Sequence, residues 1–285
     1  GEVGLPRVEG PLDPSRPLVV IDAGHGGFDP GAGTGSLKEK ALTLSLAKAL
    51  RDALLEHGGI RVALTRDDDR YLLLPERAGI ARRLKADLFI SIHADSAPGT
   101  DASGGTVFTL SDRGSSQTAA KLAEAENRAD TVNGVQLSGL SNSVNAILVE
   151  LSQRETATAS ADFAQLILRE GGGKLRFKDR SIQSAAFVVL KSADLPSVLF
   201  EAGYISSPGD AEWLHSAEGK KAFADATAQA IEPMSLLTAS YSVALLHRFG
   251  HLLRTLAHRV ERLALRVHGA VGIAVAELGA GIAHG

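Results

Sequence analysis

The sequence predicts an α/β protein with a single, mostly parallel or mixed sheet of about six strands flanked by helices. Short, continuous apolar runs recur along the chain, and such runs are typical of strands covered on both faces. They alternate with longer segments whose apolar residues follow helical spacing, a pattern typical of α/β sheets. The chain has 285 residues, 44% of them hydrophobic and 22% charged, so it can bury a sizeable core.

The first two strands are each followed by a helix. Leu18–Ile21 is an apolar run that ends in a glycine-rich loop. Ala41–Glu56 has apolar residues three and four positions apart and stops at Gly58, as a helix does. Ile60–Leu64 is a second apolar run, and Pro75–Leu84 begins with a proline that suits the first turn of a helix. We therefore expect strand, helix, strand and helix over these ranges.

Four more strands and a helical insertion complete the predicted domain. Leu88–Ile92 and Thr106–Leu110 are the third and fourth apolar runs. Between the fourth and fifth strands we expect an insertion, 111–180, because polar and amphipathic helical patterns flank a Gly/Ser/Asn-rich stretch. It divides into a helix at 115–128, a loop at 132–142 and one or two helices over 143–170. The last two strands are expected at Ala186–Leu190 and Val198–Phe200.

The two ends of the chain differ from the domain between them. Residues 1–16 contain three prolines and no hydrophobic periodicity, which predicts a linker before a domain spanning 17–232. The segment 233–285 has no Lys or Asp but has five His and five Arg, set opposite apolar residues at helical spacing. This pattern predicts a basic amphipathic helical tail. Such a helix could bind a membrane surface or a partner helix, or pack on its own domain.

Composition excludes several function classes. The net charge of −3 and the 5% of aromatic residues argue against nucleic-acid binding. The chain has no cysteine, so disulfides, thiol catalysis and Cys-ligated zinc are excluded. No apolar run reaches 18 residues, so we expect no transmembrane helix. The chain begins with Gly1 rather than Met and contains no visible leader, which leaves the question of export open.

Potential metal ligands follow the predicted strands. His25, His93 and Glu201 each come at the end of a strand, where ligands bind in parallel sheets. Glu39 lies at the entry to the first predicted helix. Catalytic zinc takes three N or O ligands, and a separate carboxylate can move the water's proton. Taken singly, each residue has an ordinary explanation, such as a hydrogen-bonding loop histidine or a first-turn carboxylate. Asp22 and Asp95 are further candidates, which we expect to support ligands rather than bind metal.

Two other catalytic patterns are absent. The loop Gly24–Gly27 does not match G-x-G-x-x-G, and no Lys-Ser/Thr pair follows it, so nucleotide binding is disfavoured. No G-x-S-x-G sequence occurs, which disfavours a serine hydrolase of the α/β type. A zinc-dependent hydrolase is therefore the prediction that the residues favour.

Long strings in the sequence also resemble a known family. VVIDAGHGGFDPGA, Glu39, LTRDDD and ERAGIARRLKADLFISIHAD occur in that order, followed by AAFVVLKSADLPSVLFEAGYISSPGD. Over about 18–232 the chain resembles the catalytic domain of zinc-dependent N-acetylmuramoyl-L-alanine amidases of the AmiC type, which act in cell division. The family's fold is an α/β sheet surrounded by helices. The resemblance implies one zinc ion held by His25, Glu39 and His93, with Glu201 as the catalytic glutamate.

The resemblance also implies a substrate and a form of regulation. The substrate is peptidoglycan outside the cytoplasmic membrane, in the periplasm or beyond, where the amide between N-acetylmuramic acid and L-alanine is cleaved during daughter-cell separation. In cell-division amidases a helix of the insertion covers the zinc cleft until an activator protein moves it. Glu126 would supply the occluding carboxylate, with Glu124 as the alternative. A zinc peptidoglycan carboxypeptidase and a catalytically silent wall-binding module are the competing hypotheses. The tail has no counterpart in the family motif.

Overall fold

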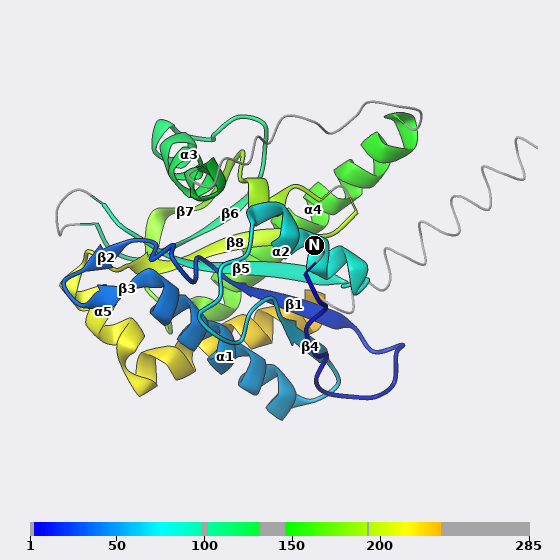
Figure 1. Ribbon diagram of the computed structural model, residues 1–285, viewed down its shortest axis with the longest axis horizontal. Coiled ribbons are helices and arrows are strands. Elements are labelled where there is room, and N and C mark those ends of the chain that lie inside the picture. The colour runs from blue at the N-terminus through cyan, green and yellow to red at the C-terminus, as the bar shows by residue number, and fades with distance from the viewer. Residues whose placement is uncertain (1–2, 98–101, 132–145, 193, 235–285) are drawn as a thin grey trace, which may run out of the picture. The chain divides into compact units, whose positions relative to one another are not determined.

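A computed structural model of the chain describes residues 3–97, 102–131, 146–192 and 194–234 (Figure 1). The loop expected at 132–142 and nearly all of the tail expected at 233–285 lie outside these ranges. Within them, no helix has the length and apolar character needed to cross a membrane.

The centre of the structure is a six-stranded sheet in the order β4-β1-β5-β8-β6-β7. Its strands, in chain order, are β1 (Leu18–Ala23), β4 (Arg61–Leu64), β5 (Leu88–Asp95), β6 (Gly105–Leu110), β7 (Phe177–Ala185) and β8 (Ser197–Tyr204). All neighbouring pairs are parallel except β6 and β8, which are antiparallel. The predicted fold class, a mostly parallel or mixed sheet of about six strands, is confirmed.

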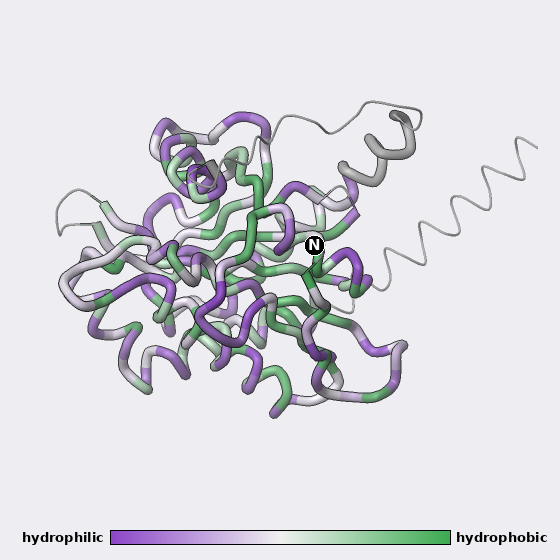
Figure 2. Tube along the Cα trace, in the orientation of Figure 1, coloured by the Kyte–Doolittle hydropathy of each residue, from purple (hydrophilic) through white to green (hydrophobic). Residues whose placement is uncertain are grey.

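Helices cover both faces of this sheet. One face packs against α1 (Glu39–His57), α4 (Ala146–Gly171), α5 (Pro208–His215) and the helical residues 217–234. The other packs against α2 (Leu74–Arg83), α3 (Gln117–Thr131) and the 3-10 turn η1 (Val188–Leu190). The tube through the central strands is coloured as hydrophobic in Figure 2, as expected for strands buried on both faces.

Two of the predicted helices form for the reasons that the sequence gives. In α1, Leu42, Leu46 and Leu50 lie on one buried stripe, and the helix ends before Gly58, whose φ is 75°. In α2, Pro75 lies in the first turn, and the Glu76 carboxylate accepts a hydrogen bond of 2.9 Å from the Leu73 amide. α2 thereby begins close to the end of β1, which matters for the site.

The fifth predicted strand, Ala186–Leu190, is wrong. The strand that occupies this place in the sheet is β7, which ends at Ala185, and residues 188–190 form η1 instead. Phe187, Val189 and Leu190 are apolar because they fill the core beneath α3, and a short apolar run does not distinguish a strand from a buried turn. β7 itself is a polar edge strand and carries no such run. The insertion between β6 and β7 contains α3 and α4, and the expected range 111–180 overlaps the start of β7.

The sequence also did not predict several smaller elements. These are the hairpin of β2 (Gly33–Thr34) and β3 (Leu37–Lys38), the helix α5 and the helical residues 217–234. The N-terminal segment, expected to be a linker over 1–16, contacts the domain: Glu9 and Val62 exchange two backbone hydrogen bonds of 2.8 and 2.9 Å. This bridge extends the sheet at the β4 edge and protects part of that edge from other pairing.

Candidate metal centre

Three neighbouring strands bring the candidate residues to one edge of the sheet. His25 lies two residues after the end of β1, His93 lies near the end of β5, and Glu201 lies in β8, opposite His93 in the strand register. β5 pairs with β1 on one side and β8 on the other. The fourth residue, Glu39, is the first residue of α1 and reaches the same edge from above the sheet.

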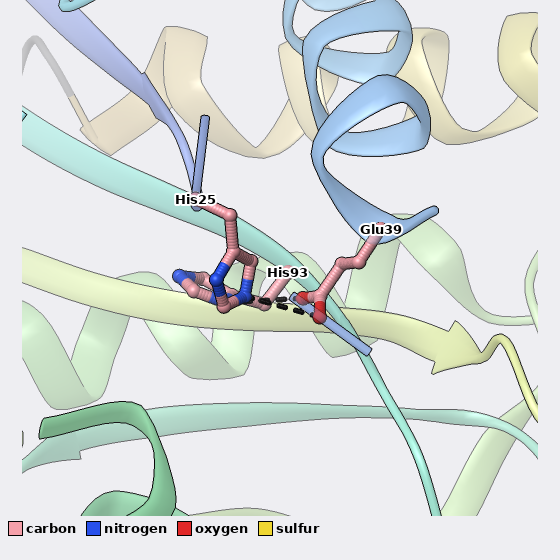
Figure 3. Close-up of side chains that lie close together, drawn as sticks. All are labelled: His25, Glu39 and His93. Atoms are coloured by element: carbon pink, nitrogen blue, oxygen red, sulfur yellow. Dashed lines mark hydrogen bonds and ion pairs between the residues drawn. The ribbon is translucent and has the colours of Figure 1, made fainter. Parts of the chain in front are cut away.

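His25, Glu39 and His93 form a compact buried cluster (Figure 3). Each offers one ligand atom, and these atoms all lie within 4.8 Å of one another. Oε2 of Glu39 is 3.0 Å from Nε2 of His25, and Oε1 of Glu39 is 3.2 Å from Nδ1 of His93. The two imidazole rings meet edge to face with centroids 4.9 Å apart. The predicted ligands therefore converge on one point.

The cluster fits a metal ion such as zinc. Nε2 of His25 is buried and makes no hydrogen bond of acceptable geometry within the described residues, although it faces Glu39 at 3.0 Å. A buried imidazole nitrogen without such a partner is costly unless a cation or a proton occupies the space in front of it. Two imidazoles and one carboxylate are also a donor set typical of catalytic zinc, which leaves one position open.

Hydrogen bonds fix the orientation of two of these ligands. Nδ1 of His25 lies 2.8 Å from Oδ2 of Asp29, so Nε2 is the nitrogen left to face the cluster. The Glu39 carboxylate accepts hydrogen bonds from the amides of Ala94 at 2.9 Å and Ala32 at 2.8 Å. Together these bonds hold the His25 ring and both oxygens of Glu39 in place.

The electrostatic field of the cluster favours a cation. Burial lowers the pKa of His25, but the carboxylates of Glu39, Glu126 and Asp29 outweigh burial and hold this pKa well above its ordinary value. Burial likewise raises the pKa of Glu39, but His25 and His93 outweigh it and hold this pKa well below its ordinary range. The negative charge that favours a proton on His25 favours a metal ion at the same point.

The glycine-rich loop is required for this geometry. His25 itself has a φ of 61°, an unusual value for a residue with a side chain, and Gly26 follows with a φ of 126°. A Cβ atom at Gly26 would lie 2.2 Å from the carbonyl oxygen of Arg70, and one at Gly24 would lie 2.5 Å from the His93 ring. Gly24 therefore lets the two histidines approach each other.

Glu201 lies outside the ligand cluster and is fully buried. Neither of its carboxylate oxygens has a hydrogen-bond partner within the described residues. Burial, followed by the negative charges of Asp95 and Glu39, raises the pKa of Glu201 well above its ordinary value. A buried carboxyl group of this kind, on the strand next to a candidate metal ligand, is suited to accept and donate protons.

A further acidic residue faces the cluster from α3. Oε2 of Glu126 is 3.4 Å from Nε2 of His25 and 3.3 Å from Nδ1 of His93. Glu124 instead points away: its side chain is 68% exposed and pairs with Arg128 at 3.1 Å. Between α3 and the loop that carries His25 lies a cleft of about 340 Å³. α3 thus covers the candidate centre.

Asp22 and Asp95 do not join the ligand cluster. Asp22 is buried beneath it, where it pairs with Arg77 at 3.0 Å. Asp95, at the end of β5, lines the cleft, and burial, together with the charges of Glu39 and Glu126, raises its pKa to about 6. Both residues therefore lie near the cluster without belonging to it, and a supporting role for them stays a prediction.

Sequence reasoning missed three residues around the centre. These are Asp29, which orients His25, and the buried Arg66 and Arg77, which bind the loop carrying His25. All three lie inside the long strings that carry the family resemblance, and that was the available signal. Periodicity treats an arginine as a surface residue, so it does not reveal one that is buried.

Two imidazoles and a carboxylate converge at the edge of a mostly parallel sheet, beside a buried carboxyl group that has no hydrogen-bond partner among the residues the structure describes. This combination defines the class as α/β enzymes with a candidate metal centre suited to hydrolysis. The chain belongs to the N-acetylmuramoyl-L-alanine amidase family, whose family model matches residues 19–233. It is therefore an amidase that acts on cell-wall peptidoglycan, as the sequence predicts.

Individual relatives agree with this assignment. The chain is 40% identical over 216 residues to the N-acetylmuramoyl-L-alanine amidase AmiA of Escherichia coli strain K12, covering 75% of this chain and 74% of AmiA. It is 36% identical over 219 residues to the amidase AmiC of Neisseria meningitidis serogroup B, covering 76% of this chain and 52% of AmiC. Among solved structures, the amidase AmiC2 of Nostoc punctiforme matches with a TM-score of 0.53 at 30% identity, covering 76% of this chain and 95% of AmiC2.

Proposed function

We propose that the chain is a zinc-dependent enzyme that hydrolyses the amide between the lactyl group of N-acetylmuramic acid and L-alanine. His25, Glu39 and His93 would hold one zinc ion. The observation that carries this proposal is the convergence of three ligand atoms within 4.8 Å, one of them a buried imidazole nitrogen that has no hydrogen-bond partner in the described part of the chain. Bound zinc supplies Lewis acidity and lowers the pKa of a water molecule to roughly 7.

The protein's own residues would position the reactants and move the proton. Glu201 takes a proton from the attacking water and returns it to the nitrogen of the leaving L-alanine. It is suited to this role because both its oxygens are buried and have no protein partner within the described residues. Asp29 and the amides that bind Glu39 keep the ligands in place, so that little reorganisation accompanies the reaction.

We infer that α3 blocks the centre at rest. Besides the position of Glu126, the support is a set of contacts that hold α3 against the domain. The Asn127 side chain donates to the carbonyl of Ala186 and accepts from the amide of Val188, both at 2.9 Å. Buried Asp130 accepts hydrogen bonds from the Tyr71 hydroxyl at 2.7 Å and from an amide of the first turn of α2. A protein activator would displace α3 from these contacts.

The biological setting follows from the substrate. Peptidoglycan lies outside the cytoplasmic membrane, so we propose a periplasmic or otherwise extracytoplasmic location and a role in separating daughter cells. The catalytic domain would span residues 17–232, with 111–180 as the regulatory insertion.

Digestion of purified peptidoglycan with and without a chelator tests the activity. The assay compares the wild-type chain, Glu201→Gln, and the control Glu212→Gln, an exposed glutamate on α5. Each is also combined with Glu126→Ala, so that blocking by α3 does not hide the result. We expect free peptides that begin with L-alanine, loss of activity on chelation and in Glu201→Gln, and retention in Glu212→Gln.

Three results would contradict the proposal. Activity that survives both chelation and Glu201→Gln would exclude the mechanism. Release of single amino acids from the peptide ends would identify a carboxypeptidase instead. Binding to peptidoglycan with no released product, even when Glu126 is replaced, would indicate a silent wall-binding module.

A further inference from the structure

Arg66 is one of the largest side chains that the fold buries completely. It lies just after β4, in the string LTRDDD, and is 1% exposed. Its guanidinium donates to five neutral acceptors: the carbonyls of Ala23 at 2.9 Å, Gly24 at 2.8 Å, Lys40 at 2.9 Å and Asp68 at 3.0 Å, and the hydroxyl of Thr43 at 3.2 Å. Its hydrogen-bond partners among the described residues are backbone carbonyls and one hydroxyl.

These acceptors belong to the segments that carry two of the ligands. Ala23 and Gly24 directly precede His25, whereas Lys40 directly follows Glu39. A single nitrogen, Nη2 of Arg66, binds the carbonyls of both Gly24 and Lys40. The Thr43 hydroxyl reinforces the link, because it donates to the Gly24 carbonyl at 2.9 Å. Arg66 therefore joins the end of β1 to the first turn of α1.

The joined loop is one that needs external support. With a φ of 61°, His25 is in a left-handed conformation that persists only where the surroundings hold it. A second buried arginine, Arg77, donates to the carbonyls of Ala23 at 2.8 Å and His25 at 2.9 Å. Consecutive carbonyls from Ala23 to His25 are thus each bound by a guanidinium. The ends of the loop cannot shift without breaking several buried hydrogen bonds.

The site favours arginine over any other cation. Burial lowers the pKa of Arg66 to about 10, which leaves the group charged near neutral pH but reflects a substantial desolvation cost. A guanidinium offers five donors in a fixed planar fork, whereas a lysine ammonium offers three from a single atom and would not span these segments. The bridge depends on that fork.

We propose that Arg66 is a positioning residue of the metal centre, which sets the separation between His25 and Glu39 by binding the backbone beside each. Arg66 does not supply a ligand atom to the cluster of His25, Glu39 and His93. The inference rests on the metal centre proposed above. Replacing Arg66 should therefore change the affinity of the centre for a metal ion and the geometry in which the ion is held, even when no peptidoglycan is present.

Metal binding by Arg66→Lys tests this inference. The zinc dissociation constant is measured by competition with a chromophoric chelator, and the ligand geometry by the visible absorption of the cobalt(II)-loaded chain. We expect Arg66→Lys to weaken zinc binding roughly 10- to 100-fold, as for other groups that orient ligands, and to change the cobalt spectrum. Arg82→Lys, at an exposed position, is the matched control. The zinc dissociation constant of this variant should stay within about twofold of the wild-type value.

A second control separates positioning from stability. Leu54→Ala removes buried volume at the far end of α1, so it should lower the melting temperature while zinc affinity stays within about twofold of wild type. If Arg66→Lys does not fold, Thr43→Val carries the test. It keeps the shape of the side chain and removes the hydroxyl that joins Gly24 to Arg66, and we expect roughly tenfold weaker zinc binding.

The outcomes separate this inference from the function on which it rests. Wild-type zinc affinity and an unchanged cobalt spectrum in Arg66→Lys, with a lowered melting temperature, would mean that Arg66 only stabilises the fold and would overturn the inference. Failure of the wild-type chain to bind zinc or cobalt would overturn the metal centre and the inference together. Unchanged binding in Thr43→Val, where that variant carries the test, would also overturn it.

Discussion

Oε2 of Glu126 lies 3.4 Å from Nε2 of His25, the nitrogen that faces the Glu39 carboxylate at 3.0 Å. Two carboxylates from different helices therefore meet the same imidazole nitrogen. Glu39 is held by backbone amides, whereas Glu126 belongs to α3, which reaches the centre from the inserted segment. Because of this difference, we expect Glu126 to be the group that leaves when substrate enters.

Glu126→Ala should raise the basal activity of the isolated chain. If α3 covers the centre in 90–99% of molecules, removal of the Glu126 contact raises hydrolysis roughly 10- to 100-fold. Dye release from labelled peptidoglycan measures the effect. Glu124→Ala is the matched control, because Glu124 lies two residues away, points outward and pairs with Arg128. Equal activity in the two variants would show that Glu126 does not block the centre.

Asp29→Asn should weaken metal binding. The Asp29 carboxylate lies 2.8 Å from Nδ1 of His25 and orients that ring. Loss of such an orienting partner typically weakens metal binding by roughly 10- to 100-fold, and we expect a loss of this size here. Titration with zinc against a chelator provides the measurement. Asp52→Asn, an exposed change on α1, should leave the affinity as it is. An unaltered dissociation constant in Asp29→Asn would mean that His25 needs no such support.

Gly24→Ala should displace His93. The added methyl group would lie 2.5 Å from that ring. Relief of this overlap should lower the free energy of unfolding by about 1–3 kcal/mol and should also move His93 out of its position in the cluster. Gly79→Ala in α2, where the new methyl group meets nothing within 4 Å, should instead stabilise the chain by up to about 1 kcal/mol. The melting temperatures of the two variants are measured by thermal unfolding with and without zinc. A zinc-induced rise in melting temperature that survives in Gly24→Ala would contradict the expectation.

Asp22→Asn should reduce stability at neutral pH and have less effect in acid. Burial raises the pKa of Asp22, but the charge of Arg77, hydrogen bonds from Thr65 and Ser91, and the charge of His93 outweigh burial and hold the pKa below its ordinary value of 3.8. A carboxylate with a lowered pKa contributes stability above that ordinary value, and this contribution is lost as the pH falls through the folded pKa.

Urea unfolding at several pH values measures this contribution. At pH 7 the variant leaves Arg77 without its carboxylate partner, which we expect to cost about 3–5 kcal/mol. The difference in unfolding free energy between wild type and variant should shrink as the pH falls below about 4. A difference that stays constant from pH 7 to pH 3 would show that Asp22 is not charged in the folded protein.

The sequence predicts the central strands and one edge of the site because both depend on local patterns. Continuous apolar runs identify β1 and β5, and the carboxyl ends of parallel strands meet at one edge, which places His25 beside His93. The pairing of Glu201 with His93 depends on strand order, which no local pattern determines. Glu39 reaches the cluster only through the entry angle of α1, so its role rested on family resemblance.

The remaining differences have physical causes of the same kind. β7 is a polar edge strand, and its pairing with β6 comes from the sheet rather than from hydrophobic periodicity. The run at 186–190 is apolar because η1 fills the core under α3. Arg66 carries a charge but lies in the interior, where its hydrogen bonds to backbone carbonyls replace the lost hydration. Only tertiary contacts reveal this.

The strand β5, which carries His93, and the helix α3, which carries Glu126, are expected to differ in local stability. β5 is flanked by β1 and β8, and its residues from Leu88 to Ala94 are buried. Amide hydrogens in such a central strand exchange with solvent only when the whole domain unfolds, whereas α3 can detach in a smaller opening. Deuterium uptake would therefore separate the slow amides beside His93 from faster ones beside Glu126. We therefore expect α3 to leave without loosening the candidate metal ligands.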